Sequence, residues 1–83
     1  MEIKQVQYFL TVAEAGSFSV AAEDLYISQS SLSKQIIALE KELGIPLFDR
    51  SKRKIALTPA GETYLKHARN IHAEYQVLMT DLG

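Results

Sequence analysis

The sequence predicts a mainly α-helical domain with one short β-hairpin and a long helix at its C-terminal end. Three observations support this fold class. Apolar residues recur at helical spacing in four stretches, two short segments between the third and fourth stretch have strand character, and glycine or proline stands at the borders. The 83 residues fit one small domain.

Composition excludes several classes of protein. The chain has no cysteine, which excludes disulfides and thiolate metal sites. Its apolar runs are too short to span a membrane and its N-terminus lacks the features of a signal peptide, so we expect a cytoplasmic protein without a membrane partner. Hydrophobic residues make up 47% and charged residues 23%, as in ordinary globular domains and unlike disordered chains.

The first two predicted helices are short. Residues 3–15 repeat apolar side chains at helical spacing, and Gly16 follows, where a helix commonly ends in the left-handed conformation. Ser17 is a good N-cap for a second helix. The buried face of that helix consists of Phe18, Ala21, Ala22 and Leu25.

The third predicted helix follows a tight connection at residues 26–28. Ser28 caps its start, and apolar residues spaced 4, 3 and 4 apart carry it to about Leu43. Gly44 then ends it, and Pro46 lies shortly beyond. Two helices joined by a tight turn, with the second longer and polar on one side, are typical of a helix-turn-helix.

A hairpin and a long helix complete the predicted fold. The segments 47–50 and 54–57 have strand character and enclose Ser51-Lys52-Arg53, which predicts a basic wing at residues 48–57. Thr58 and Pro59 then form a helix start, with a hydroxyl cap before a proline. The sequence therefore predicts a winged helix-turn-helix at 1–58 with a long C-terminal linker helix at 59–83.

The fourth helix carries a narrow apolar seam with spacings of 4, 3, 4, 3 and 4. The seam either covers the core of its own subunit or pairs with a second copy. Tyr64 and Leu65 suit the first role, whereas residues 71–82 lie too far along the helix, because each residue adds about 1.5 Å. We expect a homodimer whose interface contains Ala68, Ile71, Tyr75, Leu78 and Leu82.

Positive charge is concentrated in the middle of a chain whose net charge is −1. Residues 28–58 carry six bases and three acids, a net charge of +3. The exposed face of the third helix begins with hydroxyls, an amide and a lysine, which can bond base edges or phosphates in a major groove. We therefore predict double-stranded DNA as the partner. The recognition helix spans 28–43, its candidate contacts are Gln29, Ser30, Ser33 and Lys34, and the wing places Arg50, Lys52, Arg53 and Lys54 on the backbone or in the minor groove.

Each of these features also has an interpretation that involves no DNA binding. The serine-rich face and the basic loop are also compatible with a solvated helix and a solubilising surface. The confinement of Glu40 and Glu42 to the far end of the helix favours DNA binding. A winged helix can also serve as a protein-docking module, which would have an apolar or acidic exposed face.

Catalytic and metal-binding roles find no support in the sequence. His67 and His72 lie five residues apart, whereas metal pairs on a helix favour a spacing of four, so we expect no metal and no cofactor. The serines of the third helix have no histidine or acid in a recognisable motif to activate them, so we expect no enzyme. Tyr64 and Tyr75 suit packing better than stacking on bases.

The chain resembles the N-terminal domain of the LysR-type transcriptional regulators of bacteria over residues 1–82. The resemblance is carried by Tyr8-Phe9, by AGSFSVAAEDLYISQSSLSKQIIALEKELGIPLFDR at 15–50 and by LTPAGETYL at 57–65. It implies a nucleoid-associated dimer that binds an imperfect inverted repeat. It also implies a small-molecule effector that acts only through a C-terminal domain absent from this chain, so that this sequence is an isolated DNA-binding domain.

The resemblance also assigns roles by position. Base contacts fall on Gln29, Ser30, Ser33 and Lys34, phosphate contacts lie near Ser28 and Ser31, and wing contacts fall on Arg50 and Arg53. Two residues depart from the family pattern. Lys34 stands where arginine is common and cannot make the same two-pronged contact with guanine, so we expect it on a phosphate. Lys52 stands where glycine is often found.

Overall fold

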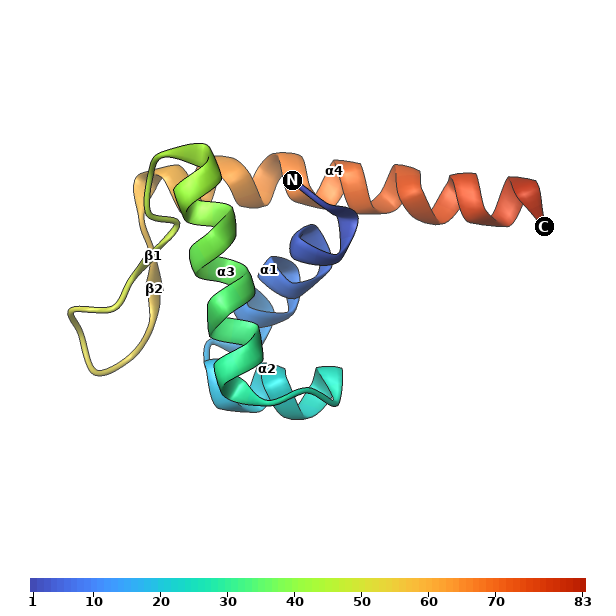
Figure 1. Ribbon diagram of the computed structural model, residues 1–83. Helices are drawn as coiled ribbons and strands as arrows, with labels where there is room; N and C mark the ends of the chain where they lie inside the picture. The colour runs from blue at the N-terminus through green and yellow to red at the C-terminus, as the bar shows by residue number, and fades with distance from the viewer.

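The computed structural model describes all 83 residues and contains four helices and one two-stranded sheet (Figure 1). The predicted winged helix-turn-helix with a long C-terminal helix is confirmed. No helix is both long and apolar enough to cross a membrane. The elements follow in the order α1 (Ile3–Ala15), α2 (Phe18–Leu25), α3 (Gln29–Leu43), β1 (Phe48–Asp49), β2 (Ala56–Leu57) and α4 (Pro59–Leu82).

The helix borders follow the predicted caps. The hydroxyls of Ser17, Ser28 and Thr58 each accept a backbone N–H at the start of α2, α3 and α4. Gly16 and Gly44 end α1 and α3 in the left-handed conformation, with φ of 66° and 74°. These local interactions explain why the helix borders could be predicted from the sequence.

The turn between α2 and α3 has one feature that the sequence did not signal. Tyr26 ends α2 in the left-handed conformation, with φ of 57°, although it is not a glycine. This conformation is unfavourable for a residue with a Cβ atom. Its backbone N–H donates to the carbonyl oxygens of Ala22 and Glu23, which closes the helix and redirects the chain into α3.

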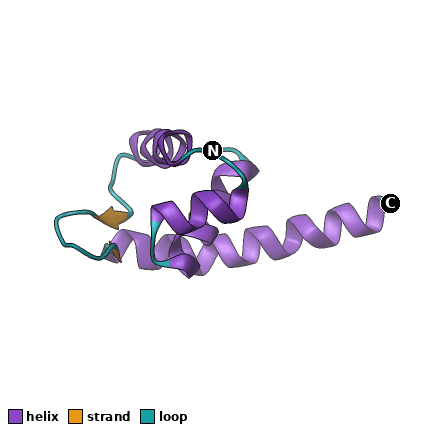
Figure 2. Ribbon diagram, turned by 90° about the horizontal axis from the view of Figure 1, so that it is seen from below, coloured by secondary structure: helices purple, strands orange, loops and turns teal.

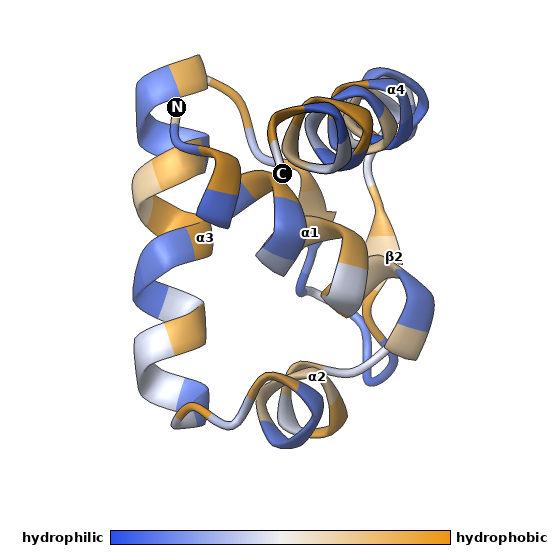
Figure 3. Cartoon of the chain, turned by 90° about the vertical axis from the view of Figure 1, so that its right-hand side faces the viewer, coloured by the Kyte–Doolittle hydropathy of each residue, from blue (hydrophilic) through white to orange (hydrophobic).

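The core lies where the first three helices meet the hairpin and the first half of α4. Figure 3 shows hydrophobic ribbon segments on the faces that α1, α2 and α3 turn toward one another. The Phe9 ring contacts Phe48 at a centroid distance of 5.1 Å and Tyr64 at 4.6 Å. The side chains buried most completely are Phe9, Leu32, Ile36, Leu39, Leu47, Val6 and Val12.

The position of Ala68 contradicts its predicted place in the dimer interface. It is fully buried in the core of its own subunit, with 0% exposure, and is therefore not available to a second copy. Its small side chain lets α4 pack closely against the body, and α1 and α4 are in contact. The boundary predicted at residue 58 is therefore not a boundary between packing units, because the first turns of α4 complete the core.

The start of α4 is fixed to the chain that precedes the wing. The Thr58 N–H donates to the carbonyl oxygen of Leu47 at 3.0 Å, and the Thr58 hydroxyl donates to that of Pro46 at 2.7 Å. One turn later, the backbone of Gly61 approaches so closely that a Cβ atom there would lie 2.0 Å from the Leu47 carbonyl oxygen. Only glycine fits this contact without movement of the backbone.

The wing contains shorter strands than the sequence predicted. Instead of strands at 47–50 and 54–57, only two antiparallel pairs form, Phe48 with Leu57 and Asp49 with Ala56. The residues between them form an open loop (Figure 2). The loop residues 51–54 are polar and exposed, so a longer strand pairing would bury no apolar side chains there.

Asp49 turns the chain out of β1. Its carboxylate accepts the hydroxyl of Ser51 at 2.6 Å and the backbone N–H of Ser51 at 2.9 Å. These two hydrogen bonds, with the nearby charge of Lys52, hold the pKa of Asp49 below its usual value. The one acid of the wing is thus engaged in forming the turn.

Candidate nucleic-acid interface

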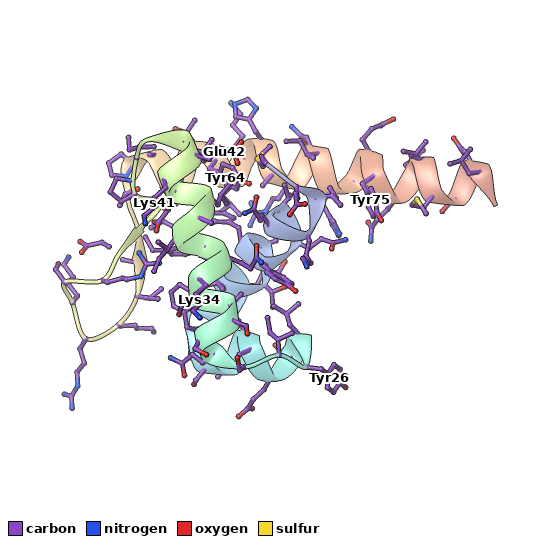
Figure 4. All side chains as sticks on the ribbon, viewed as in Figure 1. Tyr26, Lys34, Lys41, Glu42, Tyr64 and Tyr75 are labelled. Atoms are coloured by element: carbon purple, nitrogen blue, oxygen red, sulfur yellow. The ribbon has the colours of Figure 1, made fainter.

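The start of α3 presents the predicted polar side chains to solvent. Gln29, Ser30, Ser31 and Lys34 are exposed and Ser33 is half-buried, whereas Leu32 has no exposed surface. Figure 4 shows Lys34 near the start of α3 and Lys41 nearer its end. Burial of the apolar stripe thus holds the opposite face of the helix outward.

The hydroxyl of Ser28 is engaged in capping the start of α3. Its hydroxyl oxygen accepts the Ser31 N–H at 3.1 Å and its hydroxyl donates to the Ser31 Oγ at 2.9 Å. The backbone N–H groups of Gln29 and Ser30 have no partner in the chain. They lie at the positive end of the helix dipole, which favours an anion such as a phosphate.

A shallow hollow joins the start of α3 to the wing. It has a volume of ≈ 330 Å³ and is lined by no acidic residue. Gln29 lies on one side of it and the wing bases Arg53 and Lys54 on another. Of the predicted contacts, Gln29, Arg53 and Lys54 therefore lie around one hollow. Its lining consists of Gly16, Ser17, Phe18, Ser19, Gln29, Arg53, Lys54 and Ile55.

The start of α2 belongs to this face and was missed by the sequence analysis. Ser17 and Ser19 line the same hollow, and their hydroxyl oxygens lie 3.3 Å apart. The sequence identified Ser17 only as a helix cap. Its position at a helix start was a signal for anion binding, but the proximity of the wing depends on the tertiary fold.

Arg50 differs from the other predicted wing contacts. Its guanidinium Nη1 donates to Glu40 at 3.2 Å, and the group lies 5.1 Å from the centre of the Phe18 ring. No intramolecular ion pair involves Lys52, Arg53 or Lys54. Three of the four wing bases are therefore free, and the fourth is engaged within the subunit.

The second half of α4 exposes apolar side chains. Ile71, Leu78 and Leu82 of the predicted seam are exposed and Tyr75 is half-buried. Val77 and Met79, which the seam did not include, are also exposed. Figure 1 shows this part of α4 extending away from the other helices.

An apolar groove of ≈ 560 Å³ runs beside the first half of α4. Burial raises the pKa of Tyr64 in this groove, with a smaller contribution from the negative charge of Glu42. His67 lines the groove, whereas His72 lies in a separate hollow beside Glu14. The groove is lined by Met1, Leu43, Ile45, Leu47, Ala60, Thr63, Tyr64, His67 and Ile71.

Comparison with known proteins assigns the chain to a family. The sequence profile described as "Bacterial regulatory helix-turn-helix protein, lysR family" matches residues 3–62. The chain belongs to the LysR family. Among relatives, the HTH-type transcriptional regulator TfdT of Cupriavidus pinatubonensis is 49% identical over 76 residues, which cover 92% of this chain and 33% of that protein. The Hca operon transcriptional activator HcaR of Escherichia coli is 53% identical over 68 residues, 82% of this chain and 23% of HcaR.

Solved structures of LysR-family domains have the same fold as this chain. The BenM DBD in its catB site 1 DNA complex is 36% identical and superposes with a TM-score of 0.95, covering 99% of this chain and 92% of that one. The CbnR DBD in its DNA complex is 44% identical, with a TM-score of 0.87, and covers 98% and 92%. The chain is a LysR-type helix-turn-helix domain, and it spans about a third or less of the length of the curated relatives named above.

Proposed function

We propose that this LysR-family domain binds double-stranded DNA sequence-specifically in a bacterial transcriptional regulator. The observation that carries the proposal is the acid-free hollow shared by Gln29, Arg53 and Lys54. A polyanion can meet all three side chains from one side. The DNA complexes of the BenM and CbnR domains support this assignment. Such a regulator acts where bacterial DNA lies, at the nucleoid in the cytoplasm.

In this proposal the start of α3 enters the major groove. Gln29 and Ser30 are exposed there, and a glutamine amide can bond both the N6 and N7 atoms of adenine. Lys34 reaches a phosphate rather than a guanine, because an ammonium lacks the planar fork of arginine. The free N–H groups at the start of α3 and the hydroxyls of Ser17 and Ser19 face the DNA backbone.

The wing lies beside the neighbouring backbone or in the minor groove. Lys52, Arg53 and Lys54 are exposed and have no acidic partner within the chain. Each can replace a condensed counterion at a phosphate, which contributes affinity without sequence information. The recognition helix would then provide specificity, and the wing would provide sequence-independent binding.

Two copies would associate through α4. We favour an antiparallel pair, in which Leu78 and Leu82 of one copy cover the groove beside Tyr64 of the other. Both surfaces are apolar and lie on the same helix, so one two-fold axis near Ile71 would bury them together. A two-fold dimer requires two half-sites in inverted order, which accounts for an imperfect inverted repeat as target. A small-molecule effector would act through a part of the regulator outside this chain.

The test is the affinity for DNA duplexes at several salt concentrations. Duplexes of about 30 base pairs are enriched from a random pool and compared with scrambled versions by fluorescence anisotropy. We expect the enriched duplexes to bind more tightly, with an affinity that falls steeply with salt because about six phosphates are neutralised per dimer. Binding that ignores salt, or that fails to distinguish the two duplexes, contradicts the proposal and favours a protein-docking role.

Two variants separate base reading from backbone binding. Gln29→Ala removes a base contact and relaxes the preference at one position of each half-site, at a cost of about 1–3 kcal/mol on the best sequence. Arg53→Ala removes a phosphate contact, so it weakens binding to every sequence and reduces the salt dependence. If Gln29→Ala weakens all sequences equally, Gln29 does not read a base.

A further inference from the structure

Glu40 connects the end of the recognition helix to the base of the wing. Its side chain lies in the last turns of α3 and is only 11% exposed. One carboxylate oxygen accepts the backbone N–H groups of Leu47 at 2.7 Å and of Phe48 at 3.2 Å. The carboxylate also accepts Arg50 Nη1, at 3.2 Å and 3.4 Å from its two oxygens. One side chain of α3 therefore holds the chain both before and after β1.

Arg50 extends this connection to α2. Its guanidinium carbon lies 5.1 Å from the ring centre of Phe18 and 5.9 Å from that of Phe48. The group is thus held by a carboxylate from α3 and by aromatic rings from α2 and β1. Phe48 also anchors β1 in the core, but the strands of the wing pair through only two residues each and residues 51–54 are exposed. The orientation of the wing relative to α3 depends strongly on this unit.

We propose that Glu40 and Arg50 are positioning residues for DNA binding. They set the angle between the recognition helix and the wing, and Arg50 contributes through this angle rather than through a phosphate contact of its own. The inference rests on the DNA-binding function proposed above and assigns a new role within it. Since the charges of Glu40 and Arg50 compensate each other, the free positive charge of the wing comes from Lys52, Arg53 and Lys54.

The variant Glu40→Gln distinguishes positioning from simple electrostatics by the sign of its effect. Removal of a negative charge from a protein that binds a polyanion should tighten binding if charge alone matters. We expect binding to weaken by about fivefold instead, because the loss of a partly buried ion pair releases the wing. The salt slope should also fall by about two per dimer, since each released wing loses at least one phosphate contact.

Glu42→Gln is the matched control. Glu42 lies on the same helix and its loss changes the charge equally, but its carboxylate pairs with the N-terminal ammonium of Met1 rather than with the wing. We expect its DNA affinity to stay within about twofold of the parent, on the tighter side. A general effect of negative charge at the end of α3 would appear equally in both variants.

Arg50→Lys provides a second route to the same conclusion. It keeps the positive charge but lacks the planar guanidinium that lies over the rings of Phe18 and Phe48. If Arg50 contacts a phosphate directly, lysine should replace it with little loss and an unchanged salt slope. We expect a loss similar to that of Glu40→Gln, and we expect the double variant to be no weaker than either single variant, because both break one unit.

Far-UV circular dichroism checks that each variant is folded, and Arg50→Lys carries the test alone if Glu40→Gln does not fold. Parent-like or tighter binding by folded Glu40→Gln, or parent-like binding by Arg50→Lys, overturns the positioning role. Failure of the parent to bind duplexes in a salt-dependent way would instead overturn the proposed function itself. The two failures are therefore distinguishable in one set of titrations.

Discussion

The two halves of α4 share one apolar repeat but meet different surroundings. In the first half, Gly61 and Ala68 are buried and Tyr64 packs against Phe9 of α1. In the second half, Leu78 and Leu82 are exposed in the isolated subunit. Figure 1 shows the reason, since the other helices cluster beside the first half while the second half projects away.

An apolar repeat in the sequence therefore predicts which face of a helix is apolar, but it does not predict what covers that face. The helix has 24 residues and is about 36 Å long at about 1.5 Å per residue, whereas the other three helices lie mainly beside its first half. Substitutions in the first half should therefore affect folding. Substitutions in the second half should affect association.

The largest effect is expected for Ala68→Asp. It would place a charge in a fully buried position without a partner, so we expect the free energy of unfolding to fall by about 3 kcal/mol or more. Urea denaturation followed by circular dichroism measures this. Asn70→Asp, two residues further along and exposed, is the control and should change stability by no more than about 0.5 kcal/mol. Equal effects of the two variants would remove the distinction between the buried and exposed faces.

Gly61→Ala tests the close approach at the start of α4. Alanine is favoured over glycine inside a helix by about 1 kcal/mol, so helix propensity alone predicts stabilisation. We expect a loss of about 1–3 kcal/mol instead, because the new Cβ atom would collide with the Leu47 carbonyl oxygen. The shift of the thermal unfolding midpoint gives the sign directly, and an increase would be incompatible with this packing.

Leu78→Asp tests the second half. The charge would lie in the proposed interface, so we expect the dimer dissociation constant to rise by about tenfold or more while the subunit stays folded. Sedimentation equilibrium measures the mass, and circular dichroism monitors the helices. Gln76→Asp lies on another side of α4 and serves as the control of equal charge. An unchanged mass for Leu78→Asp would exclude this face as the interface.

The smallest effect is expected for Val77→Ser. Val77 is exposed and apolar like Leu78, but it lies in a hollow with Ala73 and Thr80, away from the groove beside Tyr64. We expect changes in stability and in dimer dissociation of no more than about 0.5 kcal/mol. A loss of association as large as that of Leu78→Asp would mean that the helices pair through a different face.

Local chemistry explains why most of the fold could be predicted from the sequence. Ser17, Ser28 and Thr58 bond to N–H groups three residues away, and Gly16 and Gly44 end helices through their own backbone freedom. Such features depend on residues that are close in the chain. The helix borders and the polar start of α3 could therefore be predicted from the sequence. The exposure of Gln29 followed from the apolar period of the same helix.

The features that could not be predicted depend on contacts between distant segments. The burial of Ala68 requires α1 to lie against α4. The attachment of Arg50 to Glu40 and Phe18 joins three elements, so its sequence neighbours indicated only a free basic residue. The wing strands were too long in the prediction because residues 51–54 had no partner to pack on.

The most direct test of DNA binding through the start of α3 is the variant Ser30→Glu, because folding and binding should respond in opposite directions. An acid in the first turn of a helix favours the fold by up to about 1 kcal/mol, whereas a carboxylate facing the DNA backbone should weaken binding by about tenfold or more. Asn70→Glu changes the charge equally on an exposed part of α4. We expect Ser30→Glu to be at least as stable as the parent and to lose affinity for the enriched duplex, while Asn70→Glu retains it. Equal affinity of the two variants for that duplex would contradict DNA binding through the start of α3.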